Sequence, residues 1–131
     1  MKFGLPADHA DVRPYRYVSF RACQCTRDPA NDVFLGDQEL EVGLVDKSGA
    51  SSFIGIGAYG GGIEAPYQRT GCGTGAGWGN EFETIRIRLE DFTRNGAPID
   101  LSKIDWIELR CGPAFGSKEG KIGFDDLELT R

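Results

Sequence analysis

The feature that most limits the fold of this chain is an alternation of apolar and polar residues with a period of two. In the clearest run, residues 83–89, isoleucine or leucine occupies positions 85, 87 and 89, and threonine or arginine occupies positions 84, 86 and 88. Such alternation indicates half-buried strands, and no segment of ten or more residues has helical apolar spacing. We therefore predict an all-β fold, an antiparallel β-sandwich with jelly-roll topology. The alternating runs lie at residues 15–25, 39–45, 52–58, 83–89, 104–111 and 121–129.

The last of these runs changes its rhythm in the middle. The apolar residues of 122–124 share one parity, whereas Leu127 and Leu129 share the other. One inserted residue at Asp125–Asp126 restores the register, which predicts a β-bulge there. Bulges re-aim side chains and often lie beside metal sites, so these two carboxylates are candidate metal ligands. Two carboxylates would be only part of a calcium site, because calcium needs about six to eight oxygen ligands.

Length and charge narrow the possible functions. The 131 residues fit one domain, 1–131, in which we expect residues 1–13 to form a loose N-terminal segment. A net charge of −5 argues against a nucleic-acid partner and against docking on anionic membranes. No stretch reaches the roughly 18 apolar residues that a membrane span needs.

Four cysteines, an even number in a small domain, favour an oxidising compartment. The first residues lack the apolar centre of a signal peptide, so the chain is either cytosolic or an excised piece of a secreted or periplasmic protein, and we favour the second. Cys23 and Cys25 are poor partners for each other in an extended strand. We expect a Cys25–Cys72 disulfide and, next, Cys23–Cys111; four free thiols are the alternative.

The order of several motifs resembles a known family. DVRPYRYVSFRA is followed by ELEVGLVDKSGA, then ETIRIRLEDF, then IDLSKIDWIELRC, then GKIGFDDLEL. This succession, which covers most of the chain, resembles the galactose-binding-like jelly-roll domains that serve as carbohydrate-binding modules of secreted bacterial hydrolases. The resemblance implies non-catalytic glycan binding, a neighbouring catalytic domain in the full-length chain and often a structural calcium ion (Ca2+). The family's calcium ligand near the end of the last strand corresponds to Asp125.

One candidate glycan surface is the long, glycine-rich segment between Gly60 and Asn80. Loops of this length inside compact domains are usually functional or disordered. The segment holds Tyr67 and Trp78, and an aromatic ring offers a flat platform for the C–H face of a sugar. The alternative is that Trp78 is buried beneath the sheet as part of the core.

The second candidate surface is the outer face of the sheet. Trp106, with the three arginines Arg86, Arg88 and Arg110, shares the outward parity of strands that we expect to lie near one another. A guanidinium group is a planar donor fork that suits carboxylates and vicinal hydroxyls, so this face could hold an acidic polysaccharide. The alternative is a solvated face with weak cross-strand Arg–Glu pairs.

The sequence offers few combinations of residues that could form a catalytic site. The single histidine, His9, falls in the expected loose segment, so no Ser-His-Asp or Cys-His arrangement is at hand. A pair of acidic residues could catalyse glycoside hydrolysis, but nothing in the sequence singles out one pair. We therefore expect no catalytic residues and a non-catalytic carbohydrate-binding module, with acidic and with plant or microbial polysaccharides as candidate ligands. A structural or protein-interaction domain and a small acid–base hydrolase are the alternatives.

Overall fold

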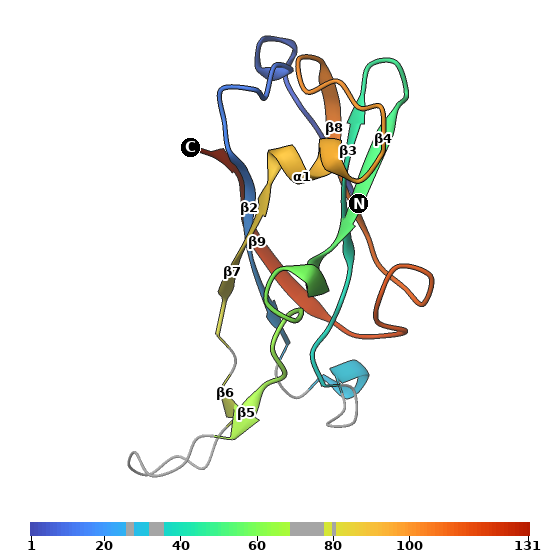
Figure 1. Ribbon diagram of the computed structural model, residues 1–131. Coiled ribbons are helices and arrows are strands. Elements are labelled where there is room, and N and C mark those ends of the chain that lie inside the picture. The colour runs from blue at the N-terminus through green and yellow to red at the C-terminus, as the bar shows by residue number, and fades with distance from the viewer. Residues whose placement is uncertain (26–27, 32–35, 69–77, 80) are drawn as a thin grey trace.

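The protein folds into two antiparallel β-sheets that pack face to face, as the computed structural model in Figure 1 shows. The structure describes residues 1–25, 28–31, 36–68, 78–79 and 81–131. One sheet has four strands in the order β1-β8-β3-β4, and the other has three in the order β7-β2-β9. The predicted all-β antiparallel sandwich is confirmed, while its jelly-roll topology stays a prediction. The strands of the two sheets are β1 (Lys2–Gly4), β2 (Tyr17–Gln24), β3 (Glu41–Asp46), β4 (Ser51–Gly55), β7 (Glu83–Arg88), β8 (Ile104–Arg110) and β9 (Ile122–Thr130).

Short elements complete the chain. Two strands of two residues each, β5 (Tyr67–Gln68) and β6 (Trp78–Gly79), pair with each other at the lower end of the view in Figure 1. No helix in the described parts of the chain is long and apolar enough to cross a membrane. The helical segments are η1 (Ala7–His9), η2 (Pro29–Asn31), η3 (Ile56–Ala58) and α1 (Leu89–Arg94).

The core lies between the two sheets and takes every second residue of their strands. Ile85 and Ile87 of β7 are 4% and 0% exposed, and Ile107 and Leu109 of β8 are 2% and 4% exposed. These residues belong to one continuous apolar cluster to which both sheets contribute. The inward parity predicted for these strands is therefore confirmed, because burial of alternate side chains is what holds the sheets together.

The N-terminal segment is not loose, and that prediction was wrong. β1 pairs with β8 in the four-stranded sheet, with Lys2 opposite Glu108. Further along, Val12 is fully buried, and its backbone N–H donates to Leu101 O at 2.9 Å. Segments this short contain too few apolar residues to show a period. The free edge of β8 supplies the hydrogen-bonding partners that order β1.

The predicted bulge in the last strand is present. In the pairing of β2 with β9, Ser19 lies opposite Glu128 but Arg21 lies opposite Asp125, so β9 carries one extra residue. Asp126 adopts a positive φ of 52°, a backbone conformation that aspartate tolerates better than most residues. The extra residue explains why the apolar parity switches between Phe124 and Leu127.

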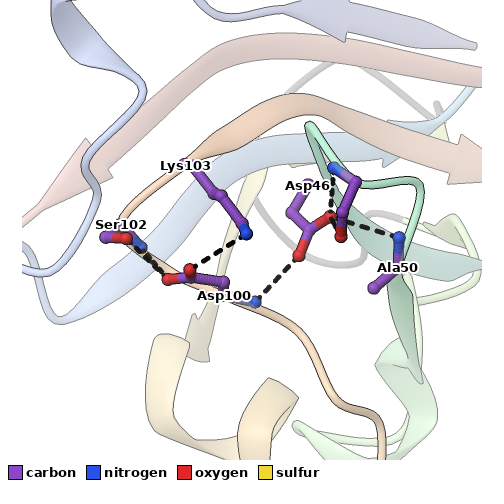
Figure 2. Close-up of polar contacts among 6 residues, drawn as sticks. Asp46, Ala50, Asp100, Ser102 and Lys103 are labelled. Carbon is purple, nitrogen blue, oxygen red and sulfur yellow. Dashed lines mark hydrogen bonds and ion pairs between the residues drawn. The ribbon is translucent and has the colours of Figure 1, made fainter.

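A buried carboxylate fixes one end of the sandwich (Figure 2). Asp46, 2% exposed, accepts hydrogen bonds from the Ser48 N–H at 2.7 Å and the Ala50 N–H at 3.2 Å within the β3–β4 turn. Its other oxygen accepts from the Asp100 N–H at 3.1 Å, in the connector before β8. The Ser48 hydroxyl and these N–H groups lower the pKa of Asp46 against the opposing effect of burial. The charged carboxylate thus ties the turn to the connector.

The helix α1 joins the edges of the two sheets, crossing from β7 to contact β4 (Figure 1). Leu89 and Phe92 anchor it in the core at 2% and 0% exposure. Just beyond its end, the Asn95 side-chain amide donates to Ser52 Oγ at 2.6 Å and Phe53 O at 3.2 Å on β4. The helix therefore fixes the spacing between the edge strands β7 and β4.

Candidate functional site

The structure separates the residues that we expected on one outer face. Arg86 and Arg88 lie on β7 in the three-stranded sheet, whereas Trp106 and Arg110 lie on β8 in the four-stranded sheet. Because the two sheets pack against each other through their apolar faces, their outer faces point in opposite directions. The predicted shared surface of arginines and tryptophan was therefore wrong, since parity along a strand does not reveal which sheet the strand joins.

The outer surface around β8, which we call the β8 face (Lys2, Phe53, Trp106, Glu108 and Arg110), forms a closed polar network. Glu108 accepts hydrogen bonds from Trp106 Nε1 and from Arg110 Nε, both at 3.3 Å. Lys2 Nζ lies 3.9 Å from Glu108 Oε2 and 4.5 Å from the centre of the Trp106 ring. Burial is the largest single influence on the pKa of Glu108 and would raise it, but these hydrogen bonds and the nearby positive charges outweigh it and lower the pKa.

Aromatic packing fills the rest of the β8 face. The Arg110 guanidinium lies 3.4 Å from the centre of the Phe53 ring and 5.4 Å from that of Phe115. The Phe53 ring in turn occupies the space above Gly43, where a Cβ would come within 2.1 Å of the ring. The charged and aromatic groups of this face are therefore already engaged with one another.

A different surface lies along the opening between the two sheets. The edge strands β7 and β4, together with α1 and η3, border a cleft of about 750 Å³, which we call the edge cleft. Its charged and aromatic lining comes from the three-stranded sheet, from α1 and from the residue after η3, and Ile54 of β4, Ala58 and Asn95 complete it. The charged and aromatic lining residues are Tyr17, Tyr59, Arg86, Arg88, Asp91 and Arg94.

The arginines of the edge cleft are weakly engaged. Arg88 and Arg94 lie 3.9 and 3.3 Å from Glu90, and both are more than half exposed, where ion pairs stabilise little. Arg86 forms no ion pair or hydrogen bond with any part of the chain that the structure describes. The cleft therefore gathers positive charge that the protein itself leaves largely unpaired, in a chain whose net charge is −5.

Tyr59 and Asp91 form a pair on the wall of the edge cleft. The Tyr59 hydroxyl donates to Asp91 Oδ2. Burial, then the hydrogen bond and the negative charge of Asp91, raise the pKa of Tyr59 to about 12, so the hydroxyl keeps its proton at neutral pH. Sequence reasoning missed Tyr59 and Arg94, and it did not single out Asp91 from the other acidic residues. They reach the cleft only because η3 and α1 fold across the sandwich edge.

Of the glycine-rich segment, the structure describes residues 60–68 and 78–79. Tyr67 is 46% exposed, and its hydroxyl donates to Glu81 Oε1 at 2.8 Å. Trp78 pairs through its backbone with Gln68, but its side chain and residues 69–77 lie outside the described residues. The predicted aromatic platform on this segment stays a prediction.

The cysteines do not form the expected disulfides. Cys23, Cys25 and Cys111 carry free thiols, so the predicted Cys23–Cys111 bond is wrong, and Cys25 is not bonded to Cys72, which itself lies outside the described residues. Cys23 is only 4% exposed, with its sulfur packed above Gly123. Cys111 comes after the end of β8 and is exposed. The two therefore lie in different environments.

The acidic bulge does not gather a metal-binding set. Asp125 is exposed and accepts a hydrogen bond from the Asp126 N–H at 2.9 Å, while Asp126 lies 3.6 Å from Arg21. Among the described residues, no three His, Cys, Asp or Glu side chains lie close enough together to hold a metal ion. These two carboxylates alone provide too few oxygens for calcium. Calcium binding at Asp125 therefore has no further support here and stays a prediction.

Comparison with known proteins found no family model, no curated protein and no solved structure that matches this chain. The resemblance to galactose-binding-like domains therefore stays a prediction that rests on the sequence motifs.

Proposed function

We propose that this domain is a non-catalytic carbohydrate-binding module that holds an acidic polysaccharide in the edge cleft. The observation that carries the proposal is the gathering of Arg86, Arg88 and Arg94 around one cleft, with Arg86 lacking a partner among the described residues. A cluster of guanidinium groups of which one is unpaired and two are only weakly paired with Glu90, on an acidic protein, is an arrangement that an anionic ligand would stabilise.

The chemistry of the lining suits a sugar that carries a carboxylate. Guanidinium groups bind carboxylates through two parallel hydrogen bonds, and they keep their charge at all physiological pH values. Tyr17 and Tyr59 add aromatic rings on which the C–H face of a sugar ring can pack. The volume of about 750 Å³ falls within the range of roughly 300–1,000 Å³ that is usual for ligand sites.

We propose binding without cleavage because of the carboxylates that the cleft offers. Among its described lining residues, Asp91 is the one carboxylate, and it accepts the hydrogen bond from Tyr59. Glycosidases use two carboxyl groups that flank the scissile bond. A lining of three arginines and one engaged carboxylate favours recognition over acid–base chemistry.

The sequence motifs support a cellular setting for this binding. Their resemblance to carbohydrate-binding modules supports a secreted or periplasmic location and a neighbouring catalytic domain in the full-length chain as a partner. In that setting, the module would keep the catalytic domain close to its polymeric substrate, which raises the effective concentration of that substrate.

Affinity gel electrophoresis tests the proposal directly. Native gels that contain polygalacturonate, alginate or hyaluronan are compared with gels that contain neutral galactan or xylan. We expect retardation by at least one acidic polymer and weaker retardation as sodium chloride is added. Because the protein itself has a net charge of −5, general electrostatics would repel it from these polymers, so retardation reports a specific site.

Matched variants locate the site. The double variant Arg86→Gln/Arg88→Gln should lose the retardation, whereas Arg131→Gln removes an exposed arginine outside the cleft and should keep it. Unchanged mobility on every polymer would contradict the proposal and favour a structural or protein-interaction domain. Release of reducing ends from a retarding polymer would contradict the non-catalytic assignment and favour the hydrolase.

A further inference from the structure

A further cleft lies beside the edge cleft, along another face of α1. This cleft, about 520 Å³, is bounded by α1 and by side chains of the segment 13–17, and we call it the 13–17 cleft. Within α1, Asp91 and Arg94 line the edge cleft, whereas Glu90 and Thr93 line the 13–17 cleft. Because helix residues three apart lie on the same face, the two clefts border two faces of one helix.

The two clefts meet at a pair of side chains that both of them share. Tyr17 and Arg88 line each cleft, and they lie opposite each other where β2 pairs with β7. Both point away from the core, because their neighbours Val18 and Ile87 are fully buried and successive strand residues alternate in direction. The Arg88 side chain is 59% exposed, so a ligand that crosses this pair at the surface can occupy both clefts.

Together, the two clefts concentrate positive charge on a protein whose net charge is −5. Their described lining contains five of the chain's 15 lysines and arginines but two of its 20 aspartates and glutamates. Such a balance favours a ligand that carries several negative charges along its length. The five cationic lining residues are Arg13, Arg16, Arg86, Arg88 and Arg94.

Arg16 is the residue of the 13–17 cleft that matches Arg86 of the edge cleft. Its guanidinium group is exposed and forms no ion pair or hydrogen bond with the described parts of the chain. Its backbone, in contrast, is held on both sides, because its N–H donates to Thr130 O at 2.7 Å and its C=O accepts from the Leu89 N–H at 2.8 Å. The fold therefore fixes the position of Arg16 and leaves its side-chain donors available.

Arg13, in the same cleft, is an engaged arginine that serves as a comparison. Its Nε and Nη2 donate to the two carboxylate oxygens of Asp11, at 2.8 and 2.7 Å. The hydrogen bond from Arg13 lowers the pKa of Asp11 to about 2, so Asp11 stays ionised and balances the charge of Arg13 at neutral pH. Of the two, Arg16 is thus the group with donors to spare for a ligand.

We propose that the edge cleft and the 13–17 cleft form one extended site that binds a run of several sugar residues of an acidic polysaccharide. Arg86 and Arg88 hold carboxylates at one end of this site, and Arg16 holds a further carboxylate at the other. The inference rests on the proposed function, and it adds that the ligand is an extended chain and not a single sugar.

The repeating chemistry of such a ligand fits the arrangement. An acidic polysaccharide repeats its carboxylates along its length, so guanidinium groups spread along a groove can each bind one. Tyr15, which lines the 13–17 cleft beside Tyr17, adds a ring for the C–H face of a sugar. A short oligomer reaches one cleft. A long one reaches both within a single binding event, so affinity should rise with length.

Isothermal titration calorimetry on the whole domain tests the inference with oligogalacturonates, oligomannuronates and hyaluronan oligomers, from the disaccharide to the octasaccharide. We expect the octasaccharide of at least one series to bind about tenfold or more tightly than its disaccharide, with one octasaccharide per domain. If a polymer retards the domain in the affinity gel but its disaccharide binds as tightly as its octasaccharide, the extended site is overturned and the proposed function stands. Absence of binding by every polymer and oligomer would overturn both.

Matched variants assign the effect of length to the 13–17 cleft. Arg16→Gln should weaken the octasaccharide at least about fivefold more than it weakens the disaccharide, whereas Arg86→Gln should weaken both. Arg13→Gln should have a smaller effect than Arg16→Gln, because Asp11 already binds the Arg13 guanidinium. The control is Arg131→Gln, an exposed arginine outside both clefts.

Thermal melts separate loss of binding from loss of folding. Arg16→Gln should leave the melting temperature unchanged, because its side chain has no partner in the described parts of the chain. An octasaccharide affinity of Arg16→Gln equal to that of Arg131→Gln would contradict the extended site. So would an equal loss for the disaccharide and the octasaccharide, since it would place all binding within one cleft.

Discussion

The β8 face and the edge cleft carry the same kinds of side chain but differ in how those side chains are engaged. On the β8 face, Arg110 is bonded to Glu108 and packed on Phe53, so its charge and its flat surface are both in use. In the edge cleft, Arg86 has no partner among the described residues, and Arg88 has only a long, exposed pair with Glu90. The number of arginines on a surface therefore says little about binding. What matters is how many of their hydrogen bonds the protein leaves unmade.

The largest effect on stability should come from Asp46, which belongs to neither surface. Its substitution shows how much the free energy of unfolding falls when a purely structural contact is lost. Asp46→Ala leaves three backbone N–H groups without their acceptor, so the free energy of unfolding should fall by about 2–4 kcal/mol. Urea unfolding measures this. Asp8→Ala, an exposed aspartate, should change the unfolding free energy by less than about 0.5 kcal/mol. An equal effect of both substitutions would contradict the structural role of Asp46.

The next effect tests whether the β8 face is as tightly filled as the structure indicates. A methyl group in Gly43→Ala would collide with the Phe53 ring, which must then move away from Arg110. The unfolding free energy should fall by about 1–3 kcal/mol, while binding of acidic polysaccharide should be unchanged. Weakened retardation in the affinity gel, at a temperature where the variant is fully folded, would contradict this expectation, because it would assign binding to the β8 face.

A single arginine from each surface then gives the direct contrast. Arg110→Gln should lower stability by up to about 1 kcal/mol, since its ion pair and ring contact are partly exposed, and should leave polysaccharide affinity unchanged. Arg88→Gln should show the reverse, with unchanged unfolding and clearly weaker binding. Isothermal titration calorimetry and thermal melts on the two proteins provide both readouts. The opposite pattern would mean that the tightly engaged Arg110 binds the polysaccharide and the weakly paired Arg88 does not.

The smallest effect concerns pH. Because the pKa of Glu108 is lowered in the folded state, the unfolded state binds its proton more readily as the solution becomes acidic. The stabilisation by Glu108 should therefore be complete above the ordinary glutamate pKa of about 4.3 and be lost as the pH falls through the lower folded value. The difference in melting temperature between the wild type and Glu108→Gln should shrink across that window. A difference that stays constant down to pH 3 would show that charge at Glu108 plays no part.

Much of the fold could be read from local pattern, and most of the candidate site could not. The strand that contains Ile85 and Ile87 could be predicted because burial of alternate side chains requires apolar residues at every second position. β1 and α1 were missed because they have three and six residues, too few for a period to appear. Tyr59 and Arg94 were missed with them, since these residues meet Arg86 only through the packing of η3 and α1 across the edge.

The amino-acid pattern alone was enough to find the longer strands, to show which side of β7 and β8 is buried, and to place an extra residue in β9 at Asp125–Asp126. Those properties follow from the two-residue repeat of an extended backbone, which is local. Long-range packing, in contrast, places β7 and β8 in different sheets, with Arg86 near α1 and Arg110 against the Phe53 ring. Strand order depends on hydrogen bonds and packing between residues far apart in the chain, and no local repeat records it.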